Sequence, residues 1–340
     1  MGKVTIYDIA KELNVSTATV NRALNNKKGV SAETQEKVLE KARALGFTVN
    51  RAAKSLARRQ IVLDFIIYNR VPVFHNEVIA GVEKAFEDLR DFNVIGYVHS
   101  FSGMEYMVHQ QILDKMQALL EEKHDGLLML GTFNMNGYRE LLEEFQKNNI
   151  KIVFVNGDLQ ECNRTFSIRQ NADLAGRLAA ELLYWFTQGG EVAVFTGRPE
   201  VMDHKESING FCAECKKRNM PVAAVYENHD DEEFAMFNTQ RLLQKYPQVK
   251  GLYINTANSA SVCAKMEELG YGGKIKIVTS DLFDDVRYYM KRNVIQATIF
   301  QDPFQQGYMA VEQLYRCVAE GVQPESTLYI QPTVILQSNI

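Results

Sequence analysis

Cysteine is scarce in this 340-residue sequence, and its five copies are widely spread. They are Cys162, Cys212, Cys215, Cys263 and Cys317. Small secreted proteins that depend on disulfides are much richer in cysteine, so a disulfide-stabilised extracellular scaffold is excluded. The composition instead predicts a protein of the reducing cytoplasm.

Long apolar runs are also missing. No stretch approaches the roughly 20 apolar residues that a membrane-spanning helix needs. The N-terminal segment MGKVTIYDIAKEL mixes charged and apolar residues, whereas a secretory signal has an uninterrupted apolar core. We therefore expect a protein with no membrane partner that stays in the cytoplasm, associated with the nucleoid.

Catalytic and metal-binding motifs are absent as well. The six histidines form no HxxxH or HExxH pattern, and neither GxSxG nor GxxxxGK[ST] occurs. Cys212 and Cys215 form a CxxC pair, but no second Cys or His pair lies at zinc-finger spacing. The carboxylate pairs at 230–231 and 284–285 fall where helices are expected to begin, and there they favour the helix dipole. We predict no catalytic residue, no metal and no cofactor, and hence no enzyme.

Charge is distributed unevenly along the chain. Residues 1–60 carry 12 Lys/Arg and 5 Asp/Glu, a net of +7, whereas residues 61–340 carry 26 and 37, a net of −11. A basic head on an acidic body is typical of a protein that contacts nucleic acid at one end. A solvated basic face is the alternative that charge alone leaves open.

Three short helical patterns occupy the basic head. In TIYDIAKEL the apolar residues recur at helical spacing, and Thr5 with Asp8 has the spacing of a capping box. A second helix is predicted over residues 17–25 with Ser16 as its cap, and a third over residues 31–45, ended by the following glycine. This order is that of a helix-turn-helix, whose second helix enters the major groove of DNA.

The outward face of the second helix has the chemistry of base recognition. Arg22 can contact guanine bidentately, Asn21 can pair with adenine, and the small residues at the helix start suit thymine methyls and phosphates. The residues of the head that we predict to contact DNA are Thr5, Ser16, Thr17, Ala18, Thr19, Asn21, Arg22 and Asn25. The alternative is a small helical cap that packs on the body, although such a cap would not need a net charge of +7.

The first 57 or so residues closely resemble the DNA-binding head of the LacI/GalR (lactose/galactose repressor) family. The family motif T-V-S-R-x-L-N reads TVNRALN over residues 19–25, so that Asn21 replaces the usual serine. The segment NRAAKSLARRQ resembles the family's hinge helix, within a linker expected over residues 49–60. By that resemblance Leu56 would wedge into the minor groove, although it could also be an ordinary linker residue. The DNA contacts expected from this segment are Asn50, Arg51, Lys54 and Leu56.

From residue 61 onward, short β-branched runs alternate with amphipathic helices. The strand candidates are IVLDFIIY, VIGYVHS, GLLML, IKIVFVN, EVAVFTG, VAAVYEN, GLYIN, IKIVTSD and IQATIFQD. This alternation predicts doubly wound parallel sheets, and about ten strands are too many for one lobe, so two lobes are expected.

Ligands of such sheets bind beyond the carboxyl ends of the strands. The residues predicted to bind a ligand there are Phe74, Asn76, Asp158, Arg198, Asn255, Asp281 and Gln301. Carboxylates and amides on both lobes, together with an aromatic face, suit a polyhydroxylated ligand such as a sugar. Each of these residues taken singly is better explained as a helix cap or a loop residue, and it is their convergence that indicates a ligand site.

Residues 61–340 resemble, more loosely, the effector domain of the same family and the sugar-binding periplasmic receptors. NADLAGRLAAELL is similar to their D-N-x-x-A-G-x-x-A-A-x-x-L segment, QDPFQQG to Q-D-P-x-x-x-G, and Asp281 matches their ligand-binding aspartate. Ser207 stands where the family usually has an arginine that grips sugar hydroxyls, and it completes the predicted ligand-binding set. The resemblance implies an N-lobe over about 61–160 and 292–321, a C-lobe over about 161–291 and 322–340, and three segments crossing between them.

The sequence thus predicts an all-α helix-turn-helix head (residues 1–48), a linker (49–60) and an α/β two-lobe, periplasmic-binding-protein-like effector domain with doubly wound parallel sheets (61–340). The predicted function is that of a DNA-binding transcriptional repressor. It would act as a homodimer on a near-palindromic operator and be switched by a small-molecule effector, a carbohydrate. A ligand-binding receptor of the sugar-uptake type, without a role on DNA, is the alternative, and an α/β enzyme is a more distant one.

Overall fold

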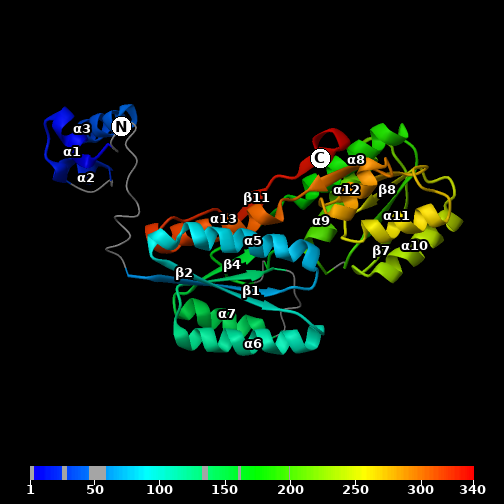
Figure 1. The fold of residues 1–340 in the computed structure, drawn as a ribbon, viewed down its shortest axis with the longest axis horizontal. Helices are drawn as coiled ribbons and strands as arrows, with labels where there is room; N and C mark the ends of the chain where they lie inside the picture. The colour runs from blue at the N-terminus through cyan, green and yellow to red at the C-terminus, as the bar shows by residue number, and fades with distance from the viewer. Residues whose placement is uncertain (1–3, 25–28, 46–58, 132–136, 160–161, 199) are drawn as a thin grey trace. The chain divides into compact units, whose positions relative to one another are not determined.

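The computed structural model describes six stretches of the chain, residues 4–24, 29–45, 59–131, 137–159, 162–198 and 200–340. The chain divides into two compact units, which we call the head (Met1–Arg59) and the body (Gln60–Ile340). Each is described by itself (Figure 1).

The described head consists of three helices, α1 (Ile6–Leu13), α2 (Thr17–Leu24) and α3 (Ala32–Ala44). The predicted capping box at the start of α1 is confirmed, because the Thr5 hydroxyl accepts from the Asp8 amide and the Asp8 carboxylate accepts from the Thr5 amide. Asn14 ends α1 in the left-handed conformation, with φ at 52°, and turns the chain into α2.

Each helix of the head contributes to one small apolar core. Ile9, Val20 and Val38 are fully buried and belong to the same cluster. The predicted cap of α2 is confirmed as well, since the Thr19 amide donates to the Ser16 hydroxyl at 3.0 Å. Helix α2 is therefore held against α1 and α3 through one face, and its other face is left exposed.

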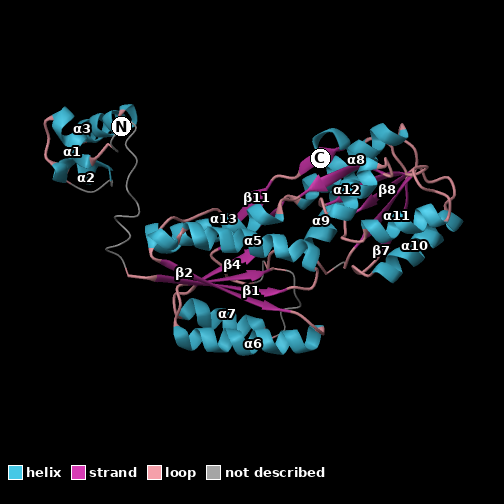
Figure 2. Cartoon of the chain, viewed as in Figure 1, coloured by secondary structure: helices cyan, strands magenta, loops and turns pink. Residues whose placement is uncertain are grey.

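The body contains two six-stranded sheets within its described residues. Sheet A has the order β11-β5-β4-β3-β1-β2, with all strands parallel. Its strands are β1 (Ile61–Tyr68), β2 (Val94–Phe101), β3 (Gly126–Leu130), β4 (Lys151–Val155), β5 (Phe166–Gln170) and β11 (Thr327–Ile330). Helices α5 (Pro72–Asp88) and α13 (Pro303–Glu320) pack on one face, and α6 (Glu105–Glu122) and α7 (Tyr138–Lys147) on the other (Figure 2). The central strands are buried from both sides, which explains their nearly continuous apolar sequence.

Sheet B has the order β12-β10-β9-β8-β6-β7, and only its edge strand β12 runs antiparallel to its neighbour. Its strands are β6 (Val192–Thr196), β7 (Val222–Glu227), β8 (Gly251–Ile254), β9 (Lys276–Ser280), β10 (Ile295–Phe300) and β12 (Thr333–Leu336). One face is covered by α8 (Ala172–Thr187) and α9 (Met202–Lys217), the other by α10 (Glu232–Lys245), α11 (Ser259–Glu268) and α12 (Asp284–Lys291). The short helices η1 (Arg90–Phe92) and η2 (Gln337–Asn339) complete the described elements.

Both lobes contain a helix pair packed so closely that glycine is required. A Cβ atom at Gly81 of α5 would collide with the Phe304 carbonyl of α13, and one at Gly307 of α13 would collide with α5. The same occurs between α8 and α9, where Gly176 and Gly210 each face the backbone of the other helix. These glycines let the helix axes approach and so allow the close spacing of the two helices on one face of each sheet.

The predicted two-lobe α/β fold with parallel sheets is confirmed, and each of the nine strand candidates overlaps a strand. Three strands were not predicted from the sequence. β5 has the polar sequence FSIRQ, and β11 and β12 have four residues each, so that periodicity gives little signal for them.

The lobe boundaries expected from the sequence need correction. Strand β10 pairs with β9 of sheet B, and β5 pairs with β4 of sheet A, so both lie in the lobe opposite to the expected one. β11 likewise pairs with β5 of sheet A. The N-lobe is therefore sheet A with its helices, and the C-lobe is sheet B with its helices. The chain still crosses three times, after β5, after β10 and between β11 and β12.

Candidate functional site

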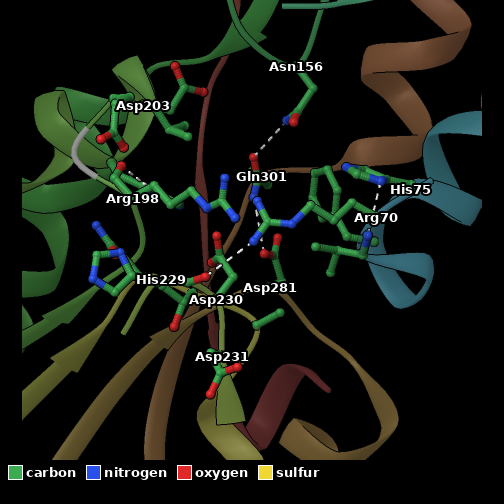
Figure 3. Close-up of a pocket in the computed structure, with 18 of the residues that line it drawn as sticks. Arg70, His75, Asn156, Arg198, Asp203, His229, Asp230, Asp231, Asp281 and Gln301 are labelled. Carbon is green, nitrogen blue, oxygen red and sulfur yellow. Dashed lines mark hydrogen bonds between the residues drawn. The ribbon is translucent and has the colours of Figure 1, made fainter. Parts of the chain in front are cut away.

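A cavity of about 690 Å³ lies between the two lobes, beyond the carboxyl ends of their strands (Figure 3). Its lining from the N-lobe side is Arg70, Val71, Phe74, His75, Glu105, Asn156, Gln170 and Gln301. Its lining from the C-lobe is Arg198, Glu200, Val201, Asp203, His204, His229, Asp230, Asp231, Phe234, Asn255, Thr256, Ala257 and Asp281. Parallel sheets place the loops after their strands at one edge, so residues far apart in sequence meet here.

The floor of the cavity consists of buried amides and one carboxyl group. Gln301, at the second crossing, donates through Nε2 to Oδ2 of Asp281 at 3.1 Å. The other carboxylate oxygen of Asp281 and the side-chain amide nitrogen and oxygen of Asn255 are buried and have no hydrogen-bond partner in the part of the chain that the structure describes. Buried polar atoms are normally paired, so these three mark positions where a ligand would bond.

Burial also changes the acidity of two cavity groups. Burial of the Asp281 carboxyl group raises its pKa to about 7 despite the hydrogen bond from Gln301. Burial, and to a smaller extent the positive charge of Arg70, lower the pKa of His75 to about 4. His75 is therefore neutral at physiological pH, and its Nδ1 accepts from the Val71 amide at 3.3 Å.

Five of the eight residues predicted to bind a ligand line this cavity. They are Phe74, Arg198, Asn255, Asp281 and Gln301. Phe74 belongs to the apolar part of the wall, together with Val71, Val201, Phe234 and Ala257, and the other four predicted residues provide polar groups.

The other three predicted ligand residues do not line it. Asn76 is exposed, and its Oδ1 accepts from Asn69 at 2.8 Å. Asp158 is buried and forms an ion pair with Arg164 beside strand β5. Ser207 lies on the buried face of α9, where its hydroxyl bonds the Tyr253 hydroxyl at 2.9 Å. In each case a structural partner holds the side chain away from the cavity.

The structure adds cavity residues that the sequence analysis left out, above all Arg70, His229 and Asp203. Arg70 and His229 follow the strands β1 and β7, so the rule that strand ends carry ligand residues would have found them. Asp203 lies in the first turn of α9 and carries no comparable signal.

Two polar contacts bridge the lobes at the cavity. Nη2 of Arg70, from the N-lobe, donates to the His229 carbonyl of the C-lobe at 3.2 Å (Figure 3). Nη1 of Arg198, from the C-lobe, is 3.2 Å from the Glu105 carboxylate of the N-lobe. The side chains of this ion pair are 34% and 49% exposed, so the solvent screens their attraction.

A third bridge, the Arg169 cluster, is buried where the chain crosses between the lobes. Arg169 of β5 is 2% exposed and contacts Asp203 at 2.7 Å and Glu206 at 2.7 and 2.9 Å, both on α9. Its guanidinium also lies 5.3 Å from the ring centre of Tyr329 on β11. Because Asp203 also lines the cavity, this cluster connects the cavity wall with strands β5 and β11, after which the chain crosses between the lobes.

In the head, the residues predicted to contact bases are accessible. Thr17, Ala18, Asn21 and Arg22 are exposed on one side of α2. The hydroxyls of Ser16 and Thr19 bond each other at 2.8 Å at the helix start, and the hydroxyl of Thr5 donates to Asp8 at 2.7 Å. These three residues therefore have a capping role, whatever contact with phosphate they also make. Other predicted sites, namely Asn25, Gly46 as a helix stop, Asn50, Arg51, Lys54 and Leu56, lie outside the described residues.

Within the described stretches, no group of three or more His, Cys, Asp or Glu side chains could hold a metal ion. Cys212 and Cys215 of the CxxC pair are free thiols on α9, and burial raises the pKa of Cys215 to about 12. None of the described helices is long and apolar enough to cross a lipid bilayer.

Known proteins match both parts of the chain. Residues 63–321 match the periplasmic binding protein domain, and residues 5–50 match the bacterial regulatory proteins of the lacI family. The ribose operon repressor of Haemophilus influenzae is 24% identical over 99% of this chain and 98% of its own length. Catabolite control protein A of Priestia megaterium is 24% identical over 76% of this chain and 75% of its own.

Solved structures show the same fold in the body. A glucose-galactose binding protein from Geobacillus stearothermophilus is 21% identical, covers 83% of this chain and 99% of its own, and has a TM-score of 0.72. A putative LacI transcriptional regulator from Bacteroides fragilis is 14% identical, covers 83% and 98%, and has a TM-score of 0.69. The chain therefore belongs to the lacI family of bacterial regulatory proteins, with a periplasmic binding protein domain as its body, and is a ligand-regulated transcriptional repressor.

Proposed function

We propose that the repressor acts in the cytoplasm as a homodimer, and that its affinity for a near-palindromic operator changes when a carbohydrate binds between the lobes. The unpartnered oxygen of Asp281 and the unpartnered amide of Asn255 carry the ligand part of this proposal. They offer acceptors and donors at one buried edge, beside the aromatic Phe74, which is the arrangement that a ring with neighbouring hydroxyls requires.

The similar proteins support the same ligand class. The relative that spans nearly the whole chain represses a ribose operon, and the structural neighbours include a glucose-galactose binding protein. Since the one protein is a repressor and the other a binding protein, and the chain has no catalytic motif, we infer that it binds the sugar without transforming it.

On DNA, helix α2 of each head would read one half of the operator. Arg22 would contact a guanine and Asn21 an adenine, while Leu56 of the linker would enter the central minor groove. A ligand can shift the equilibrium between two lobe arrangements only if it binds them with different affinity. A difference of a few kcal/mol in binding free energy is enough.

The test is selection of binding sites from random duplex DNA with the purified full-length protein, at one fixed salt concentration. We expect enrichment of a near-palindrome with a flexible central step. The Arg22→Ala variant should lose about 1–3 kcal/mol of affinity and relax the preference at one base pair per half-site. Binding without sequence preference, with and without sugars, would refute the proposal.

A further inference from the structure

The two walls of the cavity differ in charge. On the N-lobe wall, Arg70 is the one charged group besides Glu105, among the residues that the structure describes, and Glu105 is paired with Arg198. The C-lobe wall carries several carboxyl groups, including Asp230, Asp231 and Asp281. A ligand bound between these walls therefore meets a cation on one side and acceptors on the other.

Arg70 has most of its bonding capacity unused. Its one hydrogen bond within the described residues is from Nη2 to the His229 carbonyl at 3.2 Å, and it forms no ion pair there. A guanidinium has five N–H donors in a planar fork, so four remain. Figure 3 shows the side chain extending from beside α5 across the cavity toward His229.

Among the described residues, no carboxyl group of the C-lobe wall forms an ion pair with Arg70, although Glu200 and Asp230 also line the cavity. Asp203 is engaged by Arg169 at 2.7 Å, and Asp231 caps α10 by accepting from the Phe234 amide at 3.0 Å. Asp281 is bonded by Gln301, and burial raises its pKa to about 7, which reduces its negative charge near neutral pH. Asp281 and Asn255 are thus suited to hydroxyl groups rather than to a second cation.

A second guanidinium enters the same cavity from the opposite lobe. In Figure 3 Arg198 points into the cavity from the C-lobe, as Arg70 does from the N-lobe. Its ion pair with Glu105 is partly exposed to solvent and hence weak, so a ligand can compete for it.

We propose that the effector is an acidic sugar, a polyhydroxylated molecule with a carboxylate or phosphate group, whose anionic end is bound by Arg70 and whose hydroxyls are bound by Asn255 and Asp281. This inference rests on the proposed function. When the lobes close on a ligand, Arg70 loses water, and a ligand without an anionic group would leave most of its N–H donors without a strong acceptor. A carboxylate or phosphate instead matches the guanidinium fork with two parallel hydrogen bonds. Because Arg70 also holds His229, an anion at this position would connect the two lobes.

The test is calorimetric titration of the full-length protein with matched neutral and acidic sugars. The pairs are D-glucose with D-glucuronate and D-glucose 6-phosphate, and D-galactose with D-galacturonate. We expect at least one acid to bind about 10-fold or more tightly than its neutral partner, since the difference is one charge-assisted contact. The uronates and the phosphate distinguish the two kinds of anion.

Variants then assign the contact to Arg70. Arg70→Met should weaken binding of the acid roughly 10- to 100-fold and leave the neutral partner nearly unchanged, while Arg70→Lys should fall between. Arg177→Met is the matched control, because Arg177 lies on the outer helix α8 and pairs with Asp173. Melting temperatures confirm that each variant is folded.

Three outcomes would overturn the inference. They are a neutral sugar that binds as tightly as its acid, an Arg70→Met variant that loses both equally, and no response to any acid. If the same protein selects a palindromic operator, the DNA part of the proposed function stands although the acidic ligand is refuted. If it neither selects an operator nor binds any sugar, both proposals fall.

Discussion

At the scale of single residues, the surroundings of Asp281 change its acidity strongly. Its carboxyl group is 6% exposed and accepts one hydrogen bond, from Gln301, while its second oxygen is unpartnered. Burial therefore raises its pKa from 3.8 to about 7. An acid whose pKa is higher in the folded state destabilises that state when it ionises. The cost is absent below pH 3.8, grows as the pH rises, and is complete above about pH 7.

Asp281→Asn should accordingly stabilise the ligand-free protein at high pH. Above about pH 7 we expect the free energy of unfolding to rise by roughly 1–4 kcal/mol, because an amide keeps the contact with Gln301 without carrying a charge. Urea unfolding of wild type and variant across the pH range measures this. The two proteins should converge below pH 3.8, where the carboxyl group is protonated in both states, and an equal difference at every pH would contradict the assignment.

At the scale of elements, the Arg169 cluster joins strands β5 and β11 of the N-lobe to helix α9 of the C-lobe. Arg169 and Asp203 are both buried, whereas the Glu206 side chain is 32% exposed. Removing one member of a buried ion pair costs far more than the pair contributes, because the remaining charge stays without a partner. The ion pair between Arg198 and Glu105 is partly exposed and weak by comparison. We therefore expect the Arg169 cluster to persist when the lobes open, whereas the ion pair between Arg198 and Glu105 breaks.

Arg169→Met should lower the free energy of unfolding by about 3–5 kcal/mol, since Asp203 is left buried and charged. Arg177→Met, which removes a half-exposed arginine from α8, should cost less than about 1 kcal/mol. Chemical denaturation of both variants makes the comparison. A loss for Arg169→Met no larger than for Arg177→Met would show that the cluster does not hold the lobes.

At the scale of the whole body, the ion pair between Glu105 and Arg198 connects α6 of the N-lobe with the loop after β6 of the C-lobe. Together with the bond from Arg70 to His229, it links the two walls of the cavity. Such an exposed pair contributes about 0–1 kcal/mol and is screened by salt. We therefore expect this ion pair to favour closed lobes only weakly, so that a bound ligand has the larger effect.

Glu105→Gln should widen the distribution of distances between the lobes. Spin labels at the exposed positions Gln111 on α6 and Gln244 on α10 report that distance in the ligand-free protein. Low salt should favour the short distance in the wild type, and high salt should shift it toward the distribution of the variant. A variant with the same distribution as wild type at low salt would mean that the pair has no part in closure.

Much of the fold and part of the candidate site could be predicted from the sequence alone, because the relevant signals are local. Helical spacing, the cap formed by Thr5 and Asp8, and the left-handed turn at Asn14 act within a few residues, and they specify the head. Strand and helix alternation specified two parallel-sheet lobes in the same way. The rule that ligand residues follow strands placed Asn255, Asp281 and Gln301 at the cavity.

The tertiary structure decided what depends on partners distant in the chain. Strand β10 joined the C-lobe through its pairing with β9, which no local pattern encodes. Ser207 bonds to Tyr253 and Asp158 pairs with Arg164, so neither side chain lines the cavity. A buried polar group turns toward the partner that satisfies it. Asp281, by contrast, keeps one buried oxygen without a hydrogen-bond partner among the described residues, and only the folded arrangement could show which groups remain for a ligand.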